Sequence, residues 1–92
     1  MMEYEWDIAK AELNLEKHGL DFQDAHIVLE SDGSTTFDDT KHSLIELRYI
    51  TLGFLRDGLC AVVVHTMRGG KIRIISFRPA NKKERQEYGK NG

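Results

Sequence analysis

The chain has 92 residues, of which 40% are hydrophobic and 30% charged, and its formal net charge is −2. This length is typical of a single domain, residues 1–92, with one modest core. No apolar run approaches the roughly 20 residues that cross a bilayer, and the first residues lack the basic and apolar segments of a signal peptide. We therefore expect a cytoplasmic protein with no membrane contact. The one cysteine, Cys60, excludes an internal disulfide and lies in an apolar run, which indicates a buried thiol.

The charges are divided sharply between the two halves of the chain. Residues 1–46 carry twelve acids and three bases, a sum of 3 − 12 = −9, whereas residues 47–92 carry ten bases and three acids, a sum of 10 − 3 = +7. A local basic surface attracts a polyanion even when the net charge of the protein is close to zero. Because the basic half is also the half that predicts a β-sheet, the sequence indicates an arginine-bearing sheet face suited to RNA phosphates.

The first half of the chain predicts a short strand and two helices. The strand is expected at residues 4–6, and Asp7 has the position of an N-cap for a helix over residues 8–18. Gly19 follows as the left-handed residue that commonly ends a helix. A second helix is expected to start at Asp21, and the short link between the two helices favours an antiparallel or crossed pair.

Residues 31–46 are rich in turn formers and predict only a short strand at residues 35–37. The rest of the chain predicts an antiparallel β-meander, which gives the domain an α+β organisation. Its strands are expected over residues 48–55, 59–68 and 71–78, with two-residue turns at Asp57-Gly58 and Gly69-Gly70. Pro79 ends the last strand, and Asn81 is expected to cap a short C-terminal helix with Glu84 in the reciprocal capping position.

The turns assign the strand residues to the two faces of the sheet. Two-residue loops place residue 68 opposite 71, residue 66 opposite 73 and residue 56 opposite 59. The core face, which the first two helices should cover, then carries Ile50, Leu52, Phe54, Ala61, Val63, Met67, Ile72 and Ile74, with His65, Ser76, Arg48 and Arg78 as polar members. The opposite face carries Cys60, Val62, Val64, Ile75 and Phe77 at one end, and Tyr49, Thr51, Thr66, Arg68, Lys71 and Arg73 at the other. We expect the C-terminal helix to cover the apolar end and to leave the basic end open.

The basic end of this face has residue types that RNA cleavage requires. A base must activate the ribose 2′-hydroxyl and cations must stabilise the pentavalent phosphorane, and no metal ion is required. Arg73 lies mid-strand between isoleucines, where an arginine needs an anion, either a carboxylate or a phosphate. Arg68 and Lys71 flank a turn, where they are either solvated charges or phosphate contacts, and Tyr49 offers a stacking surface nearby.

Other candidate residues each have a structural alternative. Arg48 is a candidate phosphate ligand or simply an ion-pair partner of Glu46, two residues before it. Arg78 belongs either to a site or to a structural ion pair. His65 is a candidate for proton transfer because of its pKa range, although a buried core histidine is the alternative.

The C-terminal helix and the histidines give weaker signals. Lys82 and Lys83 occupy the first turn of a helix, where cations are disfavoured, so they are either tolerated there or reach for phosphate. The histidines at positions 18, 26, 42 and 65 show no metal-ligand spacing with one another or with the single cysteine. We therefore expect no metal and no cofactor.

Two sets of residues resemble the BrnT-type toxins. The opening of that family is similar to Glu5-Trp6-Asp7, Lys10, Asn14, Lys17-His18-Gly19, Phe22 and Ala25. Its second half is similar to Arg48-Tyr49-Ile50-Thr51-Leu52-Gly53, His65-Thr66 and Ile72-Arg73-Ile74-Ile75-Ser76 with Arg78. The order and spacing of these residues, rather than one motif, carry the resemblance. The chain departs from the family at Ile8, where proline is frequent, and at Phe77, where alanine is frequent.

The resemblance implies a RelE-like fold and a type II toxin that cleaves RNA and arrests growth. It also implies a cognate BrnA-like antitoxin of the ribbon-helix-helix type. Toxin and antitoxin would form a hetero-oligomer that represses its own operon, so that the toxin reaches DNA only through the antitoxin. Among the candidate residues, Arg48, His65, Arg73 and Arg78 fall in the stretches that resemble the family.

The main hypothesis is a metal-independent endoribonuclease, similar to an mRNA interferase. Arg73 and Arg48 would stabilise the transition-state phosphate, His65 or Glu46 would transfer protons, and Arg68 would hold the flanking backbone together with Lys71. Because no clear acid–base pair is visible, the alternative is a non-catalytic basic module that binds nucleic acid or an acidic partner protein. A third hypothesis is a purely structural subunit.

Overall fold

The computed structural model describes residues 2–42 and 46–91. In chain order its elements are β1 (Tyr4–Glu5), α1 (Ile8–His18), the 3₁₀ turn η1 (Phe22–Asp24), α2 (Ala25–Leu29), β2 (Thr35–Asp38), the 3₁₀ turn η2 (Thr40–His42), β3 (Tyr49–Phe54), β4 (Cys60–Arg68), β5 (Lys71–Pro79) and α3 (Lys82–Asn91). The predicted strands and helices are confirmed to within one or two residues, except that the second helix opens as a 3₁₀ turn. The end of the turn-rich segment, residues 43–45, lies outside the described residues.

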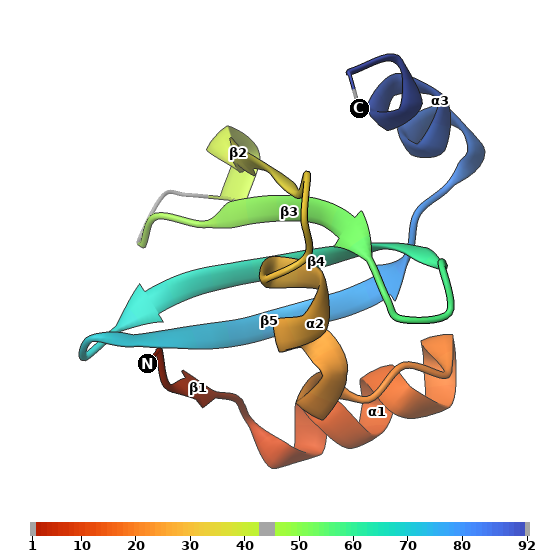
Figure 1. Ribbon diagram of the computed structural model, residues 1–92. Coiled ribbons are helices and arrows are strands. Elements are labelled where there is room, and N and C mark those ends of the chain that lie inside the picture. Colours follow the sequence, from red (N-terminus) through yellow and green to blue (C-terminus); the bar gives the residue numbers. More distant parts are fainter. Residues whose placement is uncertain (1, 43–45, 92) are drawn as a thin grey trace.

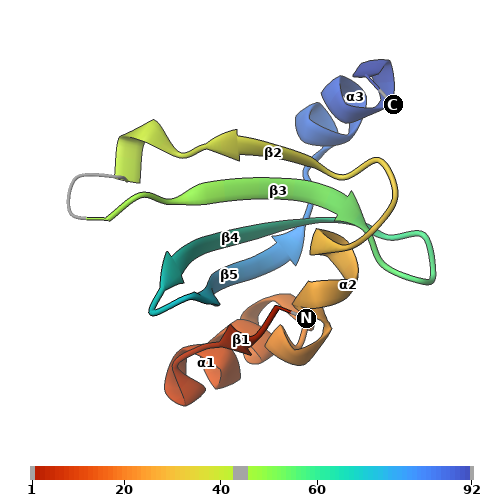
Figure 2. The same cartoon turned by 60° about the vertical axis from the view of Figure 1, so that its left-hand side comes forward.

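The strands form one five-stranded sheet in the order β1-β5-β4-β3-β2. The pairs from β2 to β5 are antiparallel, as predicted for the meander, but β1 runs parallel to β5. The sheet is therefore mixed, and the predicted antiparallel meander is only part of it. α1 and α2 lie against one face, and α3 projects from the end of β5 away from them (Figure 1). Figure 2 shows the same separation of α3 from α1.

The main core lies between the sheet and the two N-terminal helices. Its buried members are Phe22, Ala25, Val28, Ala61, Val63, Ile74 and Phe77. Gly53 lets α2 approach the sheet closely, because a Cβ at this position would lie 2.6 Å from the Val28 carbonyl oxygen. Leu52, Cys60, Val62 and Ala80 form a smaller core on the other face.

The loop between β3 and β4 differs from the predicted two-residue turn. The Leu55 amide donates to the Leu59 carbonyl at 2.9 Å, so the loop comprises residues 56–58. A type I′ turn needs positive φ at both Asp57 and Gly58, but only Gly58 has it, at 91°. The extra loop residue shifts the register by one.

This register shift reverses the predicted faces of β3, because side chains alternate along a strand. Tyr49 and Thr51 pair with His65 and Val63 and so lie on the helix-covered face. The predicted assignment of these two side chains to the basic face is wrong. Four residues predicted for the core face lie on the opposite face instead, namely Arg48, Ile50, Leu52 and Phe54.

The turn between β4 and β5 is as predicted, and a bulge further along is not. Gly69 and Gly70 have φ values of 60° and 79°, and residues 66 and 68 lie opposite 73 and 71. Between Val64 and His65 the register shifts by one. Beyond this bulge the predicted faces exchange: Phe77 is fully buried opposite Val63 in the main core, while Ser76 and Arg78 lie on the opposite face.

α1 supplies a substitute partner for the edge of β5. β1 pairs only with residues 72 and 73, and further along no described strand pairs with this edge of β5, the one away from β4. There, Asn14 Oδ1 accepts from the Phe77 amide at 3.2 Å, and Asn14 Nδ2 donates to the Phe77 carbonyl at 2.7 Å. The same nitrogen donates to the Leu20 carbonyl at 3.1 Å. One amide side chain therefore satisfies backbone groups that an adjacent strand would otherwise pair.

We expect Asn14→Ala to destabilise the fold by about 1–3 kcal/mol, because it leaves partly buried backbone groups of Phe77 without partners. The free energy of unfolding from urea denaturation measures this cost. Glu12→Ala, an exposed position on the same helix, is the matched control and should change stability little. Equal effects of the two substitutions would show that the contact with β5 is not important.

Candidate functional site

Five basic side chains lie on the sheet face that α1 and α2 leave uncovered, and each has a carboxylate partner. We call this surface the charged face. Its basic residues are Arg48, Arg68, Lys71, Arg73 and Arg78, and its acidic residues are Glu3, Glu5, Glu46 and Glu84. The expected cationic surface is thus present, but it consists of ion pairs.

One carboxylate serves two arginines at the start of β3. Glu46 Oε2 lies 3.2 Å from the Arg68 guanidinium, and Glu46 Oε1 lies 3.7 Å from Arg48 Nε. The Thr66 hydroxyl donates to the Leu47 carbonyl and so anchors this segment to β4. The Glu46, Arg48 and Arg68 side chains are partly exposed, so their ion pairs are screened by solvent.

The parallel strand β1 brings acids to the other end of the same row. Glu5 lies beside Arg73 in the register, and their side chains pair at 3.2 Å. Lys71 pairs with Glu3 at 3.6 Å. Arg73 is the least exposed cation of the charged face, with 23% of its side-chain surface accessible. The predicted need of Arg73 for an anion is therefore met by a carboxylate.

Arg48 and Arg73 lie in one row across the sheet. Thr66 lies opposite Arg73, and the β3–β4 register continued by one residue places Arg48 opposite Thr66 on its other side. Both guanidinium groups therefore lie on the same face, one strand to either side of Thr66. Thr66 itself is only 1% exposed, so an anion would meet this row at the partly exposed guanidinium groups, which are planar, permanently charged and rich in N–H donors.

Arg78 lies at the opposite end of the charged face. It is five residues beyond Arg73, or roughly 15 Å along a strand. Its two terminal nitrogens each donate to one oxygen of Glu84 at 2.8 Å. These hydrogen bonds raise the pKa of Arg78 and hold the pKa of Glu84 below its ordinary value. Arg78 is thus a structural ion pair in this conformation and does not join Arg48 and Arg73.

His65 and Tyr49 lie on the other side of the sheet from the charged face. The two rings stack with centroids 5.8 Å apart, and His65 Nε2 is hydrogen-bonded to Thr51 Oγ1 at 2.8 Å. Burial lowers the pKa of His65, so its ring is neutral at neutral pH. His65 occupies the helix-covered face that its predicted register gave it.

The C-terminal segment covers little of the charged face. Ala80, just before α3, packs into the small core with Cys60 and Val62. Burial raises the pKa of the Cys60 thiol, as expected for a packed and unreactive side chain. Lys82 and Lys83 are exposed in the first turn of α3, away from Arg73. We expected the C-terminal helix to cover the apolar end of this face, but Ala80, just before the helix, packs there instead.

The acidic partners of Lys71 and Arg73 were missed by sequence reasoning, although a signal was present. Acids and aromatics alternate in Glu3, Tyr4, Glu5 and Trp6. This period of two places the acids on one face of a strand and the aromatics on the other. Among the residues that the structure describes, no three His, Cys, Asp or Glu side chains gather in a way that could hold a metal ion. In residues 2–42 and 46–91, no helix is long and apolar enough to cross a membrane.

The chain is thus an α+β domain with helices on one face of its sheet and clustered, ion-paired arginines on the other. The family model described as "Ribonuclease toxin, BrnT, of type II toxin-antitoxin system" matches residues 6–84. The chain therefore belongs to the BrnT family of ribonuclease toxins, a type of toxin that acts with an antitoxin partner.

A solved structure supports this assignment. The crystal structure of the Brucella abortus ribonuclease toxin, BrnT, is similar to this chain with a TM-score of 0.69 and 28% sequence identity. The similarity covers 89% of this chain and 100% of the Brucella chain. A comparison with curated proteins finds no match.

The Arg78–Glu84 pair predicts a pH-dependent contribution to stability. Because the pKa of Glu84 is lowered in the folded state, the pair stabilises the protein above the ordinary glutamate pKa and is lost as pH falls through the lowered value. Glu84→Gln should cost about 1 kcal/mol near pH 7, after allowance for solvent screening, and less near pH 3. Urea denaturation at both pH values measures the difference, with the exposed Glu87→Gln as control. An equal cost at both pH values would contradict this account.

Proposed function

We propose that this protein is an endoribonuclease toxin that binds its RNA substrate on the charged face. One observation carries the proposal: Arg48 and Arg73 flank Thr66 in one row, with Arg68 and Lys71 beside them. Membership of the BrnT family supports it independently. RNA phosphates would take the places that carboxylates hold in the free protein, and Arg68 and Lys71 would bind the backbone on either side.

The roles follow from position on the charged face. Arg48 and Arg73 would stabilise the charge that develops on the phosphate in the transition state. Once phosphate draws Arg48 and Arg68 away, Glu46 would be free to accept the 2′-hydroxyl proton. This chemistry uses side chains alone, so we propose that cleavage is independent of metal ions. His65, on the other face, would act in packing rather than in proton transfer.

The remaining proposals come from the type of toxin. The partner would be a BrnA-like antitoxin of the ribbon-helix-helix type, and the complex would contact DNA through the antitoxin. Release of the toxin would arrest growth in the cytoplasm. Tyr49, Arg78, Lys82 and Lys83 receive no role in RNA cleavage, since they lie on the other face, in a structural pair or away from Arg73.

Arg73→Ala should lower RNA cleavage by at least about 100-fold, the usual cost of removing a group that stabilises transition-state charge. Cleavage of a defined RNA by purified protein, with EDTA present, measures this loss and also tests metal independence. Arg56→Ala in the β3–β4 loop removes the same charge from an exposed position and is the control. Induction of each variant in bacteria gives growth as a second readout.

Three results would contradict the catalytic proposal: intact RNA with the wild type, loss of activity in EDTA, or full toxicity of Arg73→Ala. Salt-sensitive RNA binding without any cleavage would instead favour a non-catalytic binding module, for which the ion-paired surface is equally suited.

Glu5→Gln should tighten RNA binding by about two- to fivefold, because it removes the carboxylate that competes with phosphate for Arg73. Fluorescence anisotropy with a 2′-O-methyl oligonucleotide, which cannot be cleaved through its 2′-oxygen, measures affinity alone. Glu12→Gln makes the same change in net charge on an exposed part of α1 and should have a smaller effect. Equal tightening by both variants would mean that only net charge matters.

A further inference from the structure

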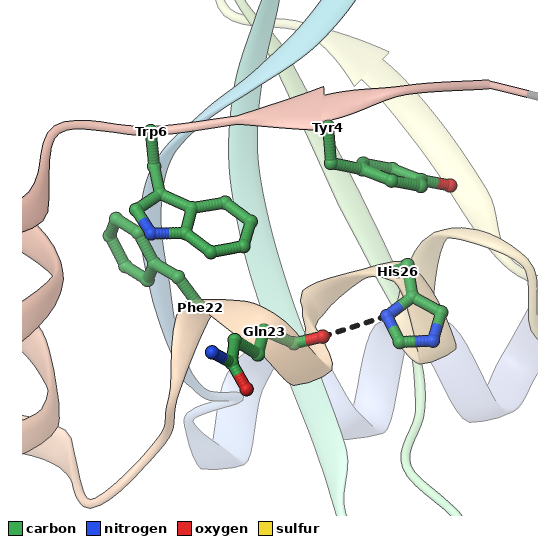
Figure 3. A pocket seen from close by; sticks show the side chains of 5 residues that line it. All are labelled: Tyr4, Trp6, Phe22, Gln23 and His26. Atoms are coloured by element: carbon green, nitrogen blue, oxygen red, sulfur yellow. Dashed lines mark hydrogen bonds between the residues drawn. The ribbon is translucent and has the colours of Figure 1, made fainter.

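β1 also builds a second surface, on the other side of the sheet edge from the charged face. While Glu3 and Glu5 reach toward Lys71 and Arg73, Tyr4 and Trp6 point the opposite way, toward η1 and α2 (Figure 3). Two adjoining hollows of about 350 and 590 Å³ lie here and share Tyr4 and His26. We call them together the β1–α2 pocket. RNA cleavage as proposed above does not use it.

The walls of the β1–α2 pocket are aromatic. The Trp6 indole meets the ring of buried Phe22 edge to face, with centroids 6.3 Å apart, so the core holds the indole in place. The rings of Tyr4 and His26 lie 5.9 Å apart at the junction of the two hollows. The faces of Trp and Tyr rings attract cations, and arginine guanidinium groups stack on them readily.

Glu30 supplies the charged acceptor of the β1–α2 pocket, beside the Tyr4 hydroxyl. The Tyr4 hydroxyl donates to Glu30 Oε2 at 2.8 Å, and burial together with Glu30 raises the pKa of Tyr4 to about 12, so the hydroxyl stays protonated. Glu30 Oε1 has no hydrogen-bond partner among the described residues. The His26 ring donates from Nδ1 to the Gln23 carbonyl at 2.8 Å, which fixes the orientation of the ring.

The negative charge around the β1–α2 pocket favours a cationic ligand. Within the described chain, the residues that line the β1–α2 pocket include Glu30 and no lysine or arginine. The pocket belongs to the half of the chain whose charges sum to 3 − 12 = −9, and Asp24 adds a further exposed carboxylate in η1. This field repels RNA phosphates and attracts a cation.

We propose that the β1–α2 pocket binds an arginine side chain of the antitoxin. The guanidinium group stacks on the Tyr4 and Trp6 rings and donates to Glu30. Arginine fits better than lysine, because its planar group can stack on a ring and still donate in its own plane to a carboxylate. The proposal rests on membership of a toxin–antitoxin family, which supplies a protein partner, and not on the cleavage chemistry of the charged face.

The test uses Trp6 as a reporter, because it is the single tryptophan of the chain. The probe is the tripeptide acetyl-Gly-Arg-Gly-amide, and its control replaces arginine with citrulline, which has the same shape and no charge. The arginine peptide should change Trp6 emission in a saturable way and bind at least about tenfold more tightly than the citrulline peptide. Glu30→Gln should weaken arginine binding about fivefold, and Glu12→Gln should leave it unchanged.

A second arm addresses the antitoxin itself. Glu30→Lys places a cation at the mouth of the pocket and should weaken the complex with co-expressed antitoxin at least about tenfold, whereas Glu12→Lys should have little effect. Both positions are exposed, so the variants are expected to fold, and thermal unfolding checks this. Tyr4→Phe keeps the ring and removes the tether to Glu30, and it should give a smaller loss than Glu30→Gln.

Several results would overturn the proposal. These are equal binding of the arginine and citrulline peptides, no effect of Glu30→Gln, or an antitoxin complex that is indifferent to Glu30→Lys. Adenosine monophosphate that alters Trp6 emission, more strongly in Glu30→Gln, would mean that the pocket takes an RNA base. The proposed function is tested separately, because Glu30→Gln should cleave RNA normally and Arg73→Ala should bind the arginine peptide normally.

Discussion

A β-bulge at Ile75 decides which side chains of β5 face the core and which face outward. In a regular strand, residues an odd number apart lie on opposite faces. Yet Ile74 and Phe77 are both buried in the core, and Arg73 and Arg78 both lie on the charged face. Both placements are possible because Ile75 is unpaired, and the side chains after it therefore point to the opposite face from the one that regular alternation would give them. The main core and the charged face therefore depend on the same local irregularity.

Acidic residues of the first half of the chain form ion pairs with basic residues of the second half. The basic half supplies the arginines of the charged face, while Glu3, Glu5 and Glu46 come from the acidic half. Partly exposed pairs of this kind contribute little to stability, so exchanging a carboxylate for a phosphate has a small net cost. The free protein thus keeps its cations neutralised and ordered, and an RNA backbone would compete with groups already in place.

Short-range signals in the sequence predicted the ends of elements well, and long-range packing limited the rest. Asp7, Gly19 and the Asn81–Glu84 capping box act locally, and the structure confirms all of them. A three-residue loop in place of a two-residue turn, and one bulge, depend on how the whole sheet packs. Each inverts the faces of every residue beyond it. Arg68, Lys71 and Arg73 were therefore predicted on the correct face, whereas Arg48 and Arg78 were wrongly assigned to the core face. Arg73 could be singled out because a mid-strand cation needs an anion, whereas its partner on a parallel strand required the fold.

β1 is only two residues long and lies at the edge of the sheet, so few backbone hydrogen bonds hold it in place. Its detachment would remove Glu5 from Arg73 and Tyr4 from Glu30 in one event. Both contacts therefore depend on one short edge strand, and the charged face and the β1–α2 pocket share it as a common support.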